Sequence, residues 1–125
     1  MIATAKIETG TIISEYGGEV MNSKEVVKEQ NRNDSVFRLV VGNESKSSLD
    51  VCPINYSNIS RFISGINNSL KYHRSLENVR SVRFAYKGRI RIVIIAKREI
   101  AAGEILYLDY NGGLEYEYPT HHFTD

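Results

Sequence analysis

Residues 79–96 contain two runs of strand-forming residues that are separated by the dipeptide Lys87-Gly88. The run from Val79 to Tyr86 alternates in polarity, and the run from Arg89 to Ala96 ends in the apolar sequence IVIIA. A two-residue connection that contains glycine is typical of a tight hairpin turn. We therefore predict a β-hairpin over residues 79–96, with its apolar end buried on both faces of the sheet.

Three further segments favour strands. Residues 11–16 (TIISEY) and 36–41 (VFRLVV) are rich in β-branched and aromatic residues. Residues 104–108 follow Ala102-Gly103, a dipeptide that favours a turn. Because β-branched and aromatic side chains are enriched in strands, we predict a strand in each segment.

Helical signals are weaker than the strand signals. Ser23 is a candidate N-cap for a short helix that runs through Gln30. Residues 58–64 fit about two helical turns, with Ile59, Phe62 and Ile63 on one side. Short strands with irregular connections and few short helices predict a mainly β fold.

Length and composition restrict the class of protein. The 125 residues suffice for one domain, and the balance of 42% hydrophobic and 25% charged residues is ordinary for a soluble globular protein. The longest apolar run is too short to span a bilayer, and the N-terminus lacks the apolar core of a signal peptide. Cys52 is the only cysteine, which excludes an intramolecular disulfide and a cysteine-built zinc site. We expect an intracellular, reduced compartment, no membrane partner, and Cys52 as a small buried residue.

Common cofactor and metal motifs are missing from the sequence. It contains neither a G-x-G-x-x-G segment after a strand nor a G-x-x-x-x-G-K-[ST] segment, so the standard phosphate-binding loops are absent. The three histidines, His73, His121 and His122, have no cysteine cluster to join them. We therefore expect no metal site.

The net charge of +1 hides an uneven distribution along the chain. Residues 71–98 contain nine Lys or Arg and one acid, Glu77. Residues 104–125 contain five acids and no Lys or Arg. The two blocks are solvated surface, pair with each other, or serve different partners.

Tyrosine is unusually frequent, with eight in the chain and a cluster in the last part of the sequence. One interpretation is that these rings pack the core and bond their hydroxyls to backbone carbonyls. The sharper interpretation is an aromatic-walled pocket or channel, which suits a cation or a methylated amine because ring faces attract positive charge. The clustered aromatic residues are Tyr107, Tyr110, Tyr116, Tyr118 and Phe123.

Four segments resemble, in order, the motifs of the SET-domain protein lysine methyltransferases. Residues 15–20 (EYGGEV) resemble the family's EYxGE strand end, and residues 58–63 (NISRFI) resemble the segment before its cofactor loop. Residues 88–104 match the R-I-x-x-x-A-x-R-x-I-x-x-G-E stretch, and residues 109–111 match the D-Y-N closing motif. The similarity covers about a hundred residues.

A closer similarity is to the plant trithorax-related enzymes that monomethylate lysine 27 of histone H3. Their R-F-I-S-G-I-N-N sequence is present at residues 61–68, where other SET domains carry N-H-S-C-x-P-N. Their D-Y-N-G and E-Y-P-T-x-H-F sequences are present at residues 109–112 and 117–123.

This resemblance implies a single SET domain over residues 1–125, of the β-clip type, with a C-terminal pseudoknot. It implies a nuclear enzyme that transfers a methyl group from S-adenosyl-L-methionine to a lysine, with lysine 27 of histone H3 as the expected acceptor. The partner would be the histone H3 tail or another lysine-containing peptide, with no requirement for direct nucleic acid binding. The acidic residues 104–125 would favour such a basic tail.

The resemblance also assigns roles to individual residues. Tyr110 becomes the active-site tyrosine and Tyr16 a second catalytic ring. The expected cofactor contacts are Arg61, Phe62, Ile63, Ser64, Gly65, Asn67, Asn68 and Tyr116, and the expected substrate contacts are Leu108, Tyr107, Tyr118 and Phe123.

Some of these assignments have alternatives. Either Ser64-Gly65 or Asn67-Asn68 replaces the family's usual Asn-His pair, and we favour the asparagines because an amide both donates and accepts at an adenine edge. Asn67 and Asn68 are otherwise turn residues. Arg61 is alternatively a structural arginine paired with an acid, and residues 117–123 are alternatively an ordered tail with no role in a pocket.

Two departures from the family pattern carry expectations. The usual first strand with its G-x-G motif would lie before Met1, so part of the cofactor site is expected to be missing from this sequence. Leu108 stands two residues before Tyr110, where the trithorax-related enzymes carry tyrosine. The lost hydroxyl predicts relaxed monomethyl specificity or reduced activity.

A different class of function competes with the enzyme. A SET-like module without transfer activity would bind histone tails or the cofactor only. Without the resemblance, the basic hairpin from Arg80 to Arg91 favours a small β-barrel that contacts nucleic acid.

Overall fold

The computed structural model describes residues 1–22, 25, 36–40, 49–112 and 118–124. The chain divides into two compact units. Unit 1 contains residues 1–13, 62–82 and 94–125, and unit 2 contains residues 14–61 and 83–93. No helix among the described residues is long and apolar enough to cross a membrane.

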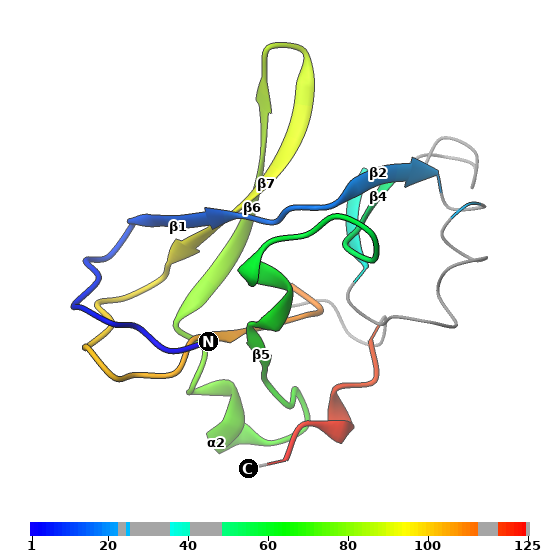
Figure 1. Ribbon diagram of the computed structural model, residues 1–125. Helices are drawn as coiled ribbons and strands as arrows, with labels where there is room; N and C mark the ends of the chain where they lie inside the picture. The colour runs from blue at the N-terminus through cyan, green and yellow to red at the C-terminus, as the bar shows by residue number, and fades with distance from the viewer. Residues whose placement is uncertain (23–24, 26–35, 41–48, 113–117, 125) are drawn as a thin grey trace. The chain divides into compact units, whose positions relative to one another are not determined.

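Five strands form the larger sheet, in the order β1-β7-β6-β8-β5 (Figure 1). The short strands β5 and β8 pair in parallel, with Ser64 opposite Tyr107 and Gly65 opposite Leu108, and β8 also pairs in parallel with β6. Strands β1, β6 and β7 contribute residues to both units. The strands are β1 (Ile12–Glu15), β5 (Ser64–Gly65), β6 (Val79–Tyr86), β7 (Arg89–Ala96) and β8 (Tyr107–Leu108).

The second sheet belongs to unit 2 and has the order β2-β4-β3. Its strands are β2 (Glu19–Asn22), β3 (Phe37–Val40) and β4 (Leu49–Cys52), and both neighbours pair antiparallel with β4. Tyr16, Val51 and Ile92 form the hydrophobic cluster of this unit. Cys52 is fully buried, as expected for a small apolar residue in a strand.

Short helices and a buried aliphatic core complete unit 1. Its helices are α2 (Lys71–Arg74) and η2 (Thr120–His122), which are each about one turn long. A third short helix, η1 (Ile59–Phe62), lies across the boundary between the units in the sequence. The core of unit 1 includes Ile63, Ile66, Val79, Ile94, Ile100, Leu106 and Leu108.

The hairpin prediction is confirmed, with strands β6 and β7 joined by Lys87-Gly88. Both turn residues have positive φ, +49° and +74°, which is typical of a type I′ turn. The prediction that residues 92–96 are buried on both faces is wrong. Ile92, Ile94 and Ala96 are buried, whereas Val93 and Ile95 are only partly covered, because alternate residues of a strand point to opposite faces and only one face is fully packed.

The other predicted strands are present with changed lengths. The strands predicted at 11–16 and 36–41 correspond to β1 and β3, although residue 41 lies outside the described residues. The strand predicted at 104–108 is reduced to β8, and Ile105 instead forms an isolated bridge with Ile2. Strands β2, β4 and β5 and the short helices α2 and η2 were not predicted.

Of the two predicted helices, one lies almost wholly outside the described residues and the other is shorter than predicted. The helix at residues 23–30 lies outside the described residues apart from Glu25. The segment 58–64 forms only the 3-10 helix η1, and its three apolar residues differ in exposure, because Ile59 and Phe62 are exposed and Ile63 is buried. Ser60 is the buried residue of this turn, since its hydroxyl donates a hydrogen bond to the Glu15 carbonyl (3.0 Å).

Candidate functional site

The segment 62–68 of unit 1 passes along strand β8. After Ile63, whose side chain is buried, the chain forms strand β5, and the Ile66 amide then donates to the Leu108 carbonyl (3.1 Å). Residues more than forty positions apart in the sequence are therefore adjacent. The expected proximity of this segment to the D-Y-N motif is confirmed.

Tyr110 lies directly against this segment. Its phenol hydroxyl donates a hydrogen bond to the Ile63 carbonyl. Burial, with a smaller contribution from Tyr118, raises the pKa of Tyr110 to about 12. The phenol therefore stays protonated at neutral pH, with its proton donated to the Ile63 carbonyl, and its oxygen can still accept a hydrogen bond without adding charge.

Two aromatic rings pack against the Tyr110 side chain. The ring of Tyr110 makes edge contacts with the rings of Tyr118 and Phe123, at centroid distances of 5.3 and 5.1 Å. The Tyr118 and Phe123 rings are nearly parallel at 6.0 Å. Edge-to-face and offset arrangements are the favoured geometries of aromatic pairs, so the three rings hold one another in place.

Gly65 makes room for this aromatic group. A Cβ atom at position 65 would lie 2.3 Å from a ring atom of Phe123, so this ring would have to move to admit any side chain. Glycine is thus required where the ring of Phe123 crosses strand β5. Gly65 and Phe123 therefore form one packing unit.

Asparagine side chains bind the loop to the C-terminal segment. The Asn68 amide nitrogen donates to Asp109 Oδ1 (3.1 Å), and its oxygen accepts from Asn111 Nδ2 (3.0 Å). The backbone amide of Asn68 donates to the Thr120 hydroxyl oxygen (3.1 Å). The side-chain Nδ2 of Asn67 donates to the Phe123 carbonyl (3.1 Å). Both amide groups are therefore engaged within the protein.

Asn111 extends this network along the chain. Its side chain exchanges hydrogen bonds with the backbone of Tyr118, donating to the carbonyl (3.2 Å) and accepting from the amide (2.8 Å). Asp109 Oδ1 also accepts from the Asn111 amide (2.9 Å). We call Asn68, Asp109 and Asn111 the polar clasp.

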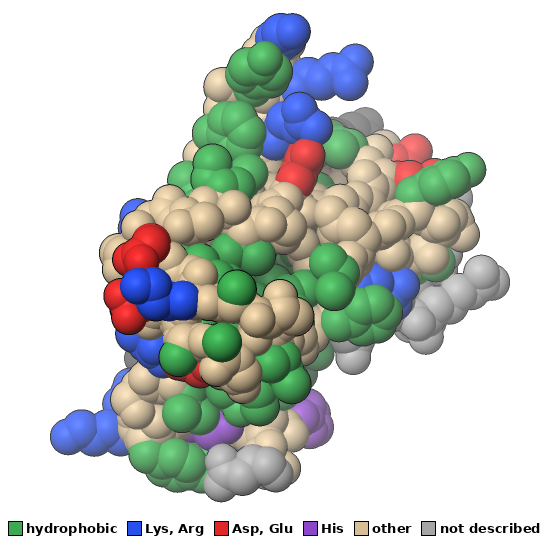
Figure 2. All heavy atoms as spheres, turned by 60° about the vertical axis from the view of Figure 1, so that its left-hand side comes forward, with side chains coloured by type: hydrophobic (Ala, Val, Ile, Leu, Met, Phe, Trp, Pro, Cys, Tyr) green, Lys and Arg blue, Asp and Glu red, His purple; other side chains and the backbone are tan. Residues whose placement is uncertain are grey.

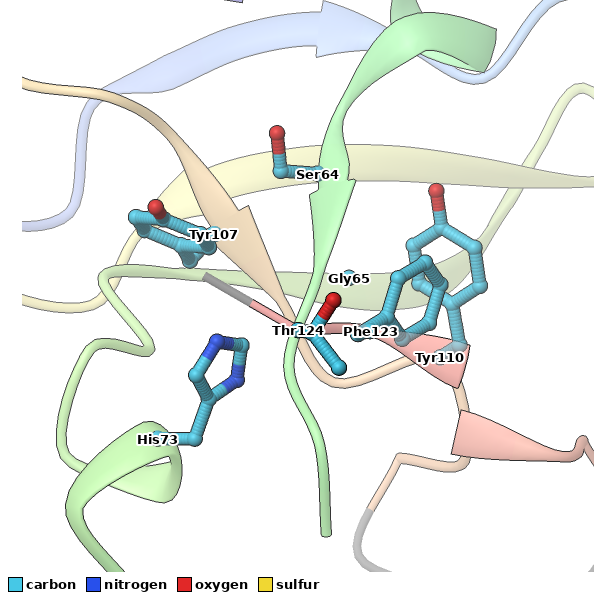
Figure 3. A pocket seen from close by; sticks show the side chains of 7 residues that line it. All are labelled: Ser64, Gly65, His73, Tyr107, Tyr110, Phe123 and Thr124. Atoms are coloured by element: carbon cyan, nitrogen blue, oxygen red, sulfur yellow. The ribbon is translucent and has the colours of Figure 1, made fainter. Parts of the chain in front are cut away.

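A pocket of about 230 Å³ lies on this side of unit 1 (Figure 3). Tyr110 and Phe123 lie on one side of strand β5, and Tyr107 and His73 lie on the other (Figure 3). The lining residues are Ser64, Gly65, His73, Tyr107, Tyr110, Phe123 and Thr124. Five of the residues expected at the site, Ser64, Gly65, Tyr107, Tyr110 and Phe123, are thus brought together.

His73 was not expected in this pocket. It is buried on α2, and its Nδ1 accepts a hydrogen bond from the Asn67 amide (2.7 Å), so the imidazole is a structural partner of the loop. The ring also makes edge contacts with Tyr72 and Tyr107. A four-residue helix has too few positions to show a period, so no sequence pattern indicates this role.

Tyr16 and Arg61 belong to unit 2. Tyr16 is buried in the hydrophobic cluster, with its ring 5.0 Å from that of Phe37. The Arg61 guanidinium donates to the Pro53 carbonyl (3.1 Å). Asn58 connects this region to the EYGGE segment, because its amide donates to the Glu15 carbonyl (2.7 Å).

The remaining predicted site residues have different surroundings. Phe62 is exposed, and Leu108 is buried at 2% exposure between its two neighbouring strands. Leu108 does not line the pocket, whereas its neighbour Tyr107 does. Tyr116 lies outside the described residues.

The acidic block is not a free rim at the residues that the structure describes. Glu104 is paired with Arg98, which is the main reason that the pKa of Glu104 falls to about 2. Asp109 is buried in the polar clasp. The expectation that these two carboxylates attract a basic tail is therefore wrong, because internal partners already use them. Glu115, Glu117 and Asp125 lie outside the described residues.

The SET domain family model matches residues 1–111, and the chain therefore belongs to the SET domain family. The β-rich fold and the family expected from the motifs are both confirmed. Two Arabidopsis thaliana proteins named histone-lysine N-methyltransferase are similar to it. ATXR5 is 41% identical over 121 residues, which cover 97% of this chain and 31% of ATXR5. ATXR6 is 43% identical over 120 residues, which cover 94% of this chain and 33% of ATXR6.

Solved structures agree with the sequence relatives. A crystal structure of ATXR5 in complex with mono-methylated histone H3.1 matches with a TM-score of 0.90 and 41% identity, and the match covers 98% of this chain and 56% of that one. A crystal structure of the Chaetomium thermophilum polycomb repressive complex 2 matches with a TM-score of 0.74 and 26% identity, over 95% of this chain and 14% of that one. This chain spans about a third of the length of the curated relatives.

Proposed function

We propose that this chain is the SET domain of a histone-lysine N-methyltransferase that uses S-adenosyl-L-methionine as methyl donor and lysine 27 of histone H3 as acceptor. The observation that carries the proposal is the position of Tyr110 in a SET-family chain. Its hydroxyl is bound to the Ile63 carbonyl beside an aromatic-walled pocket. The similarity to ATXR5 and ATXR6 supports the histone substrate, and action on chromatin would place the protein in the nucleus.

The pocket residues fit a sulfonium-bearing cofactor. The ring faces of Tyr110 and Phe123 attract positive charge, and Ser64, Tyr107 and Thr124 supply neutral hydroxyl groups. The volume of about 230 Å³ is below the ~300–1,000 Å³ of typical ligand pockets, so these residues would hold one part of the cofactor. When bound, S-adenosyl-L-methionine would supply an activated methyl group.

The hydrogen bonds favour Ser64-Gly65 over the two asparagines as the cofactor-facing pair. Ser64 and Gly65 line the pocket, and Gly65 has no side chain of its own there. The amides of Asn67 and Asn68 instead hold Phe123 and Asp109. We propose that the asparagines position the pocket wall and that Ser64-Gly65 faces the cofactor.

The protein's contribution would be positioning in a site with little water. A lysine amine must lose its proton before it accepts a methyl group, and an apolar channel next to a cation lowers its pKa. The protonated phenol of Tyr110 can orient the neutral amine without contributing charge. The expected rate enhancement comes from alignment of the reactants.

The test combines cofactor binding with a substitution at Tyr110. Isothermal titration with S-adenosyl-L-methionine should show binding by the unmodified chain and by Tyr110→Phe, and methylation of a histone H3 peptide should fall about 100-fold or more in the variant. Tyr56→Phe, at a ring that is 70% exposed, is the matched control and should retain the activity of the unmodified chain. An unchanged rate in Tyr110→Phe with intact cofactor binding would refute the assignment. Binding without any product would instead indicate the non-transferring module.

The acceptor and the product are separate parts of the proposal. A histone H3 peptide with arginine at position 27 should lose the methylation that the natural peptide receives. Mass spectrometry of the natural peptide should show dimethyl product or slow turnover, since leucine replaces tyrosine at position 108. Rapid, purely monomethyl product would show that Leu108 has no such effect.

A further inference from the structure

The turn end of the β6–β7 hairpin lies beyond the strand that flanks it. We call residues 83–91 the hairpin tip. The Tyr16 amide, just after β1 ends, donates to the Ile92 carbonyl (2.9 Å). No described strand continues alongside β7 from Ile92 toward the turn, and Figure 1 shows β6 and β7 running on past β1.

The tip places aromatic and basic side chains together. A two-residue turn puts Tyr86 opposite Arg89 and Phe84 opposite Arg91, and opposite residues share a face of the ribbon. Phe84 and Tyr86 are 38% and 51% exposed. Figure 2 shows hydrophobic and Lys or Arg side chains side by side on this hairpin.

The charge of the tip is strongly positive. It contains Arg83, Lys87, Arg89 and Arg91 and no acid. Glu15 forms a bidentate ion pair with Arg91, at 2.6 and 2.7 Å, and the Arg83 guanidinium lies 5.5 Å from the centre of the Phe37 ring. Lys87 and Arg89, which lie nearest the turn, contribute two further positive charges. A net positive ribbon with exposed rings is complementary to a polyanion that has flat apolar groups.

Lys87 occupies a backbone position that does not suit lysine. Its φ of +49° lies in the left-handed region, where asparagine and glycine are favoured. The ammonium lies 5.3 Å from the centre of the Tyr86 ring. A residue that breaks a local rule of turn chemistry without a packing need is a candidate for a binding role.

We propose that the hairpin tip binds double-stranded DNA, with Lys87 and Arg89 on phosphates and the exposed rings against the bases. A two-stranded ribbon fits the major groove, where arginine and lysine bond to phosphate or guanine and apolar groups contact thymine methyls. This proposal does not depend on methyl transfer, because the tip residues are not among those assigned to the cofactor or the lysine. An acidic peptide would pair with the basic side chains of the tip but would leave the exposed rings of Phe84 and Tyr86 without a role.

The test uses fluorescence anisotropy with a labelled DNA duplex and the full chain, between about 50 and 200 mM salt. Binding should weaken steeply with salt. The double variant Lys87→Asn/Arg89→Gln should weaken binding about tenfold and reduce the salt slope by about two, because two phosphate contacts are lost. Lys71→Gln removes an exposed charge in unit 1 and should leave the affinity unchanged.

Lys87→Asn alone separates binding from folding. Asparagine suits the left-handed turn position, so thermal stability should rise while DNA affinity falls. Methylation of a free histone H3 peptide should remain as in the unmodified chain, which distinguishes this test from that of the proposed function. Equal affinity of the double variant and the unmodified chain, tighter binding of single-stranded RNA, or equal competition by polyglutamate would each overturn the proposal.

Discussion

Gly65 and Phe123 are matched in size at the centre of the candidate site. The ring atoms of Phe123 occupy the space that any side chain at position 65 would need. The same ring packs against Tyr110. A substitution at Gly65 is therefore expected to move the Phe123 ring and, through it, to alter the position of Tyr110.

Gly65→Ala should displace Phe123 and destabilise the fold by about 1–3 kcal/mol, the usual cost of forcing extra atoms into a packed site. Denaturant unfolding and titration with S-adenosyl-L-methionine would measure the two effects. The double variant Gly65→Ala/Phe123→Leu should lose less unfolding free energy than the two single variants lose together, because the smaller side chain at position 123 relieves the clash. Additive effects would contradict the size match.

The raised pKa of Tyr110 has a sign that alkaline unfolding can test. Between pH 10 and about 12 the unfolded state loses the phenol proton while the folded state keeps it, so stability falls as pH rises through this range. The loss should be about 1 kcal/mol at one pH unit above 10 and absent in Tyr110→Phe. Urea unfolding at two alkaline pH values checks it, with the exposed Tyr56→Phe as control. Parallel losses in Tyr110→Phe and Tyr56→Phe would refute the shift.

At the scale of elements, the polar clasp connects three segments that lie far apart in the sequence. Asn68 follows strand β5, Asp109 and Asn111 follow β8, and Thr120 begins η2. Neither β5 nor β8 has more than two residues, so side-chain amides rather than a long ladder hold the segments together.

Asn111→Ala should destabilise the protein by about 2–4 kcal/mol, since it leaves buried partners without hydrogen bonds. Limited proteolysis should then cut residues 118–124 faster than in the unmodified chain. Asn55→Ala, at an exposed asparagine, is the control and should change neither measurement. Unchanged protection of that segment would show that the clasp is not what retains it.

The elements also show what sequence patterns can and cannot predict. The hairpin was predicted to the residue because alternation and turn chemistry agreed over eighteen positions. The turn at residues 59–62 was misjudged, since the buried contact there is a hydroxyl–carbonyl hydrogen bond to Glu15, which no apolar period reports. Strands β2 and β4 were missed because their burial depends on partners distant in the sequence.

At the scale of the whole molecule, motifs predicted the proximity of residues 61–68 and 109–111 but not the bonds that create it. The family resemblance predicts Tyr110, Gly65 and Phe123 as site residues. It predicts neither His73 nor the internal use of the asparagine amides, because hydrogen-bond partners follow from three-dimensional geometry.

Stability in acid should depend on Glu104. The hydrogen bond from Arg98, with further bonds from the Ala101 amide and Asn78, lowers the pKa of Glu104 to about 2. This contribution is present above pH 4.5 and is lost as pH falls toward 2, because the carboxylate must take up a proton. Glu104→Gln should cost about 1 kcal/mol at neutral pH, after allowance for solvent screening, and nothing near pH 2. Unfolding at several pH values measures this, with Glu99→Gln as control. A cost that does not change with pH would contradict the ion pair.

The parallel pairing of β5 with β8 has a kinetic consequence. The contacts that close the pocket join residues 47 to 56 positions apart, such as Tyr110 with Ile63 and Asn67 with Phe123. Loops of this size must close before any of these contacts stabilises the chain, and topologies of this kind refold in milliseconds to seconds. The pocket should therefore be among the last parts to form during refolding, and during synthesis its contacts cannot form until Phe123 has left the ribosome.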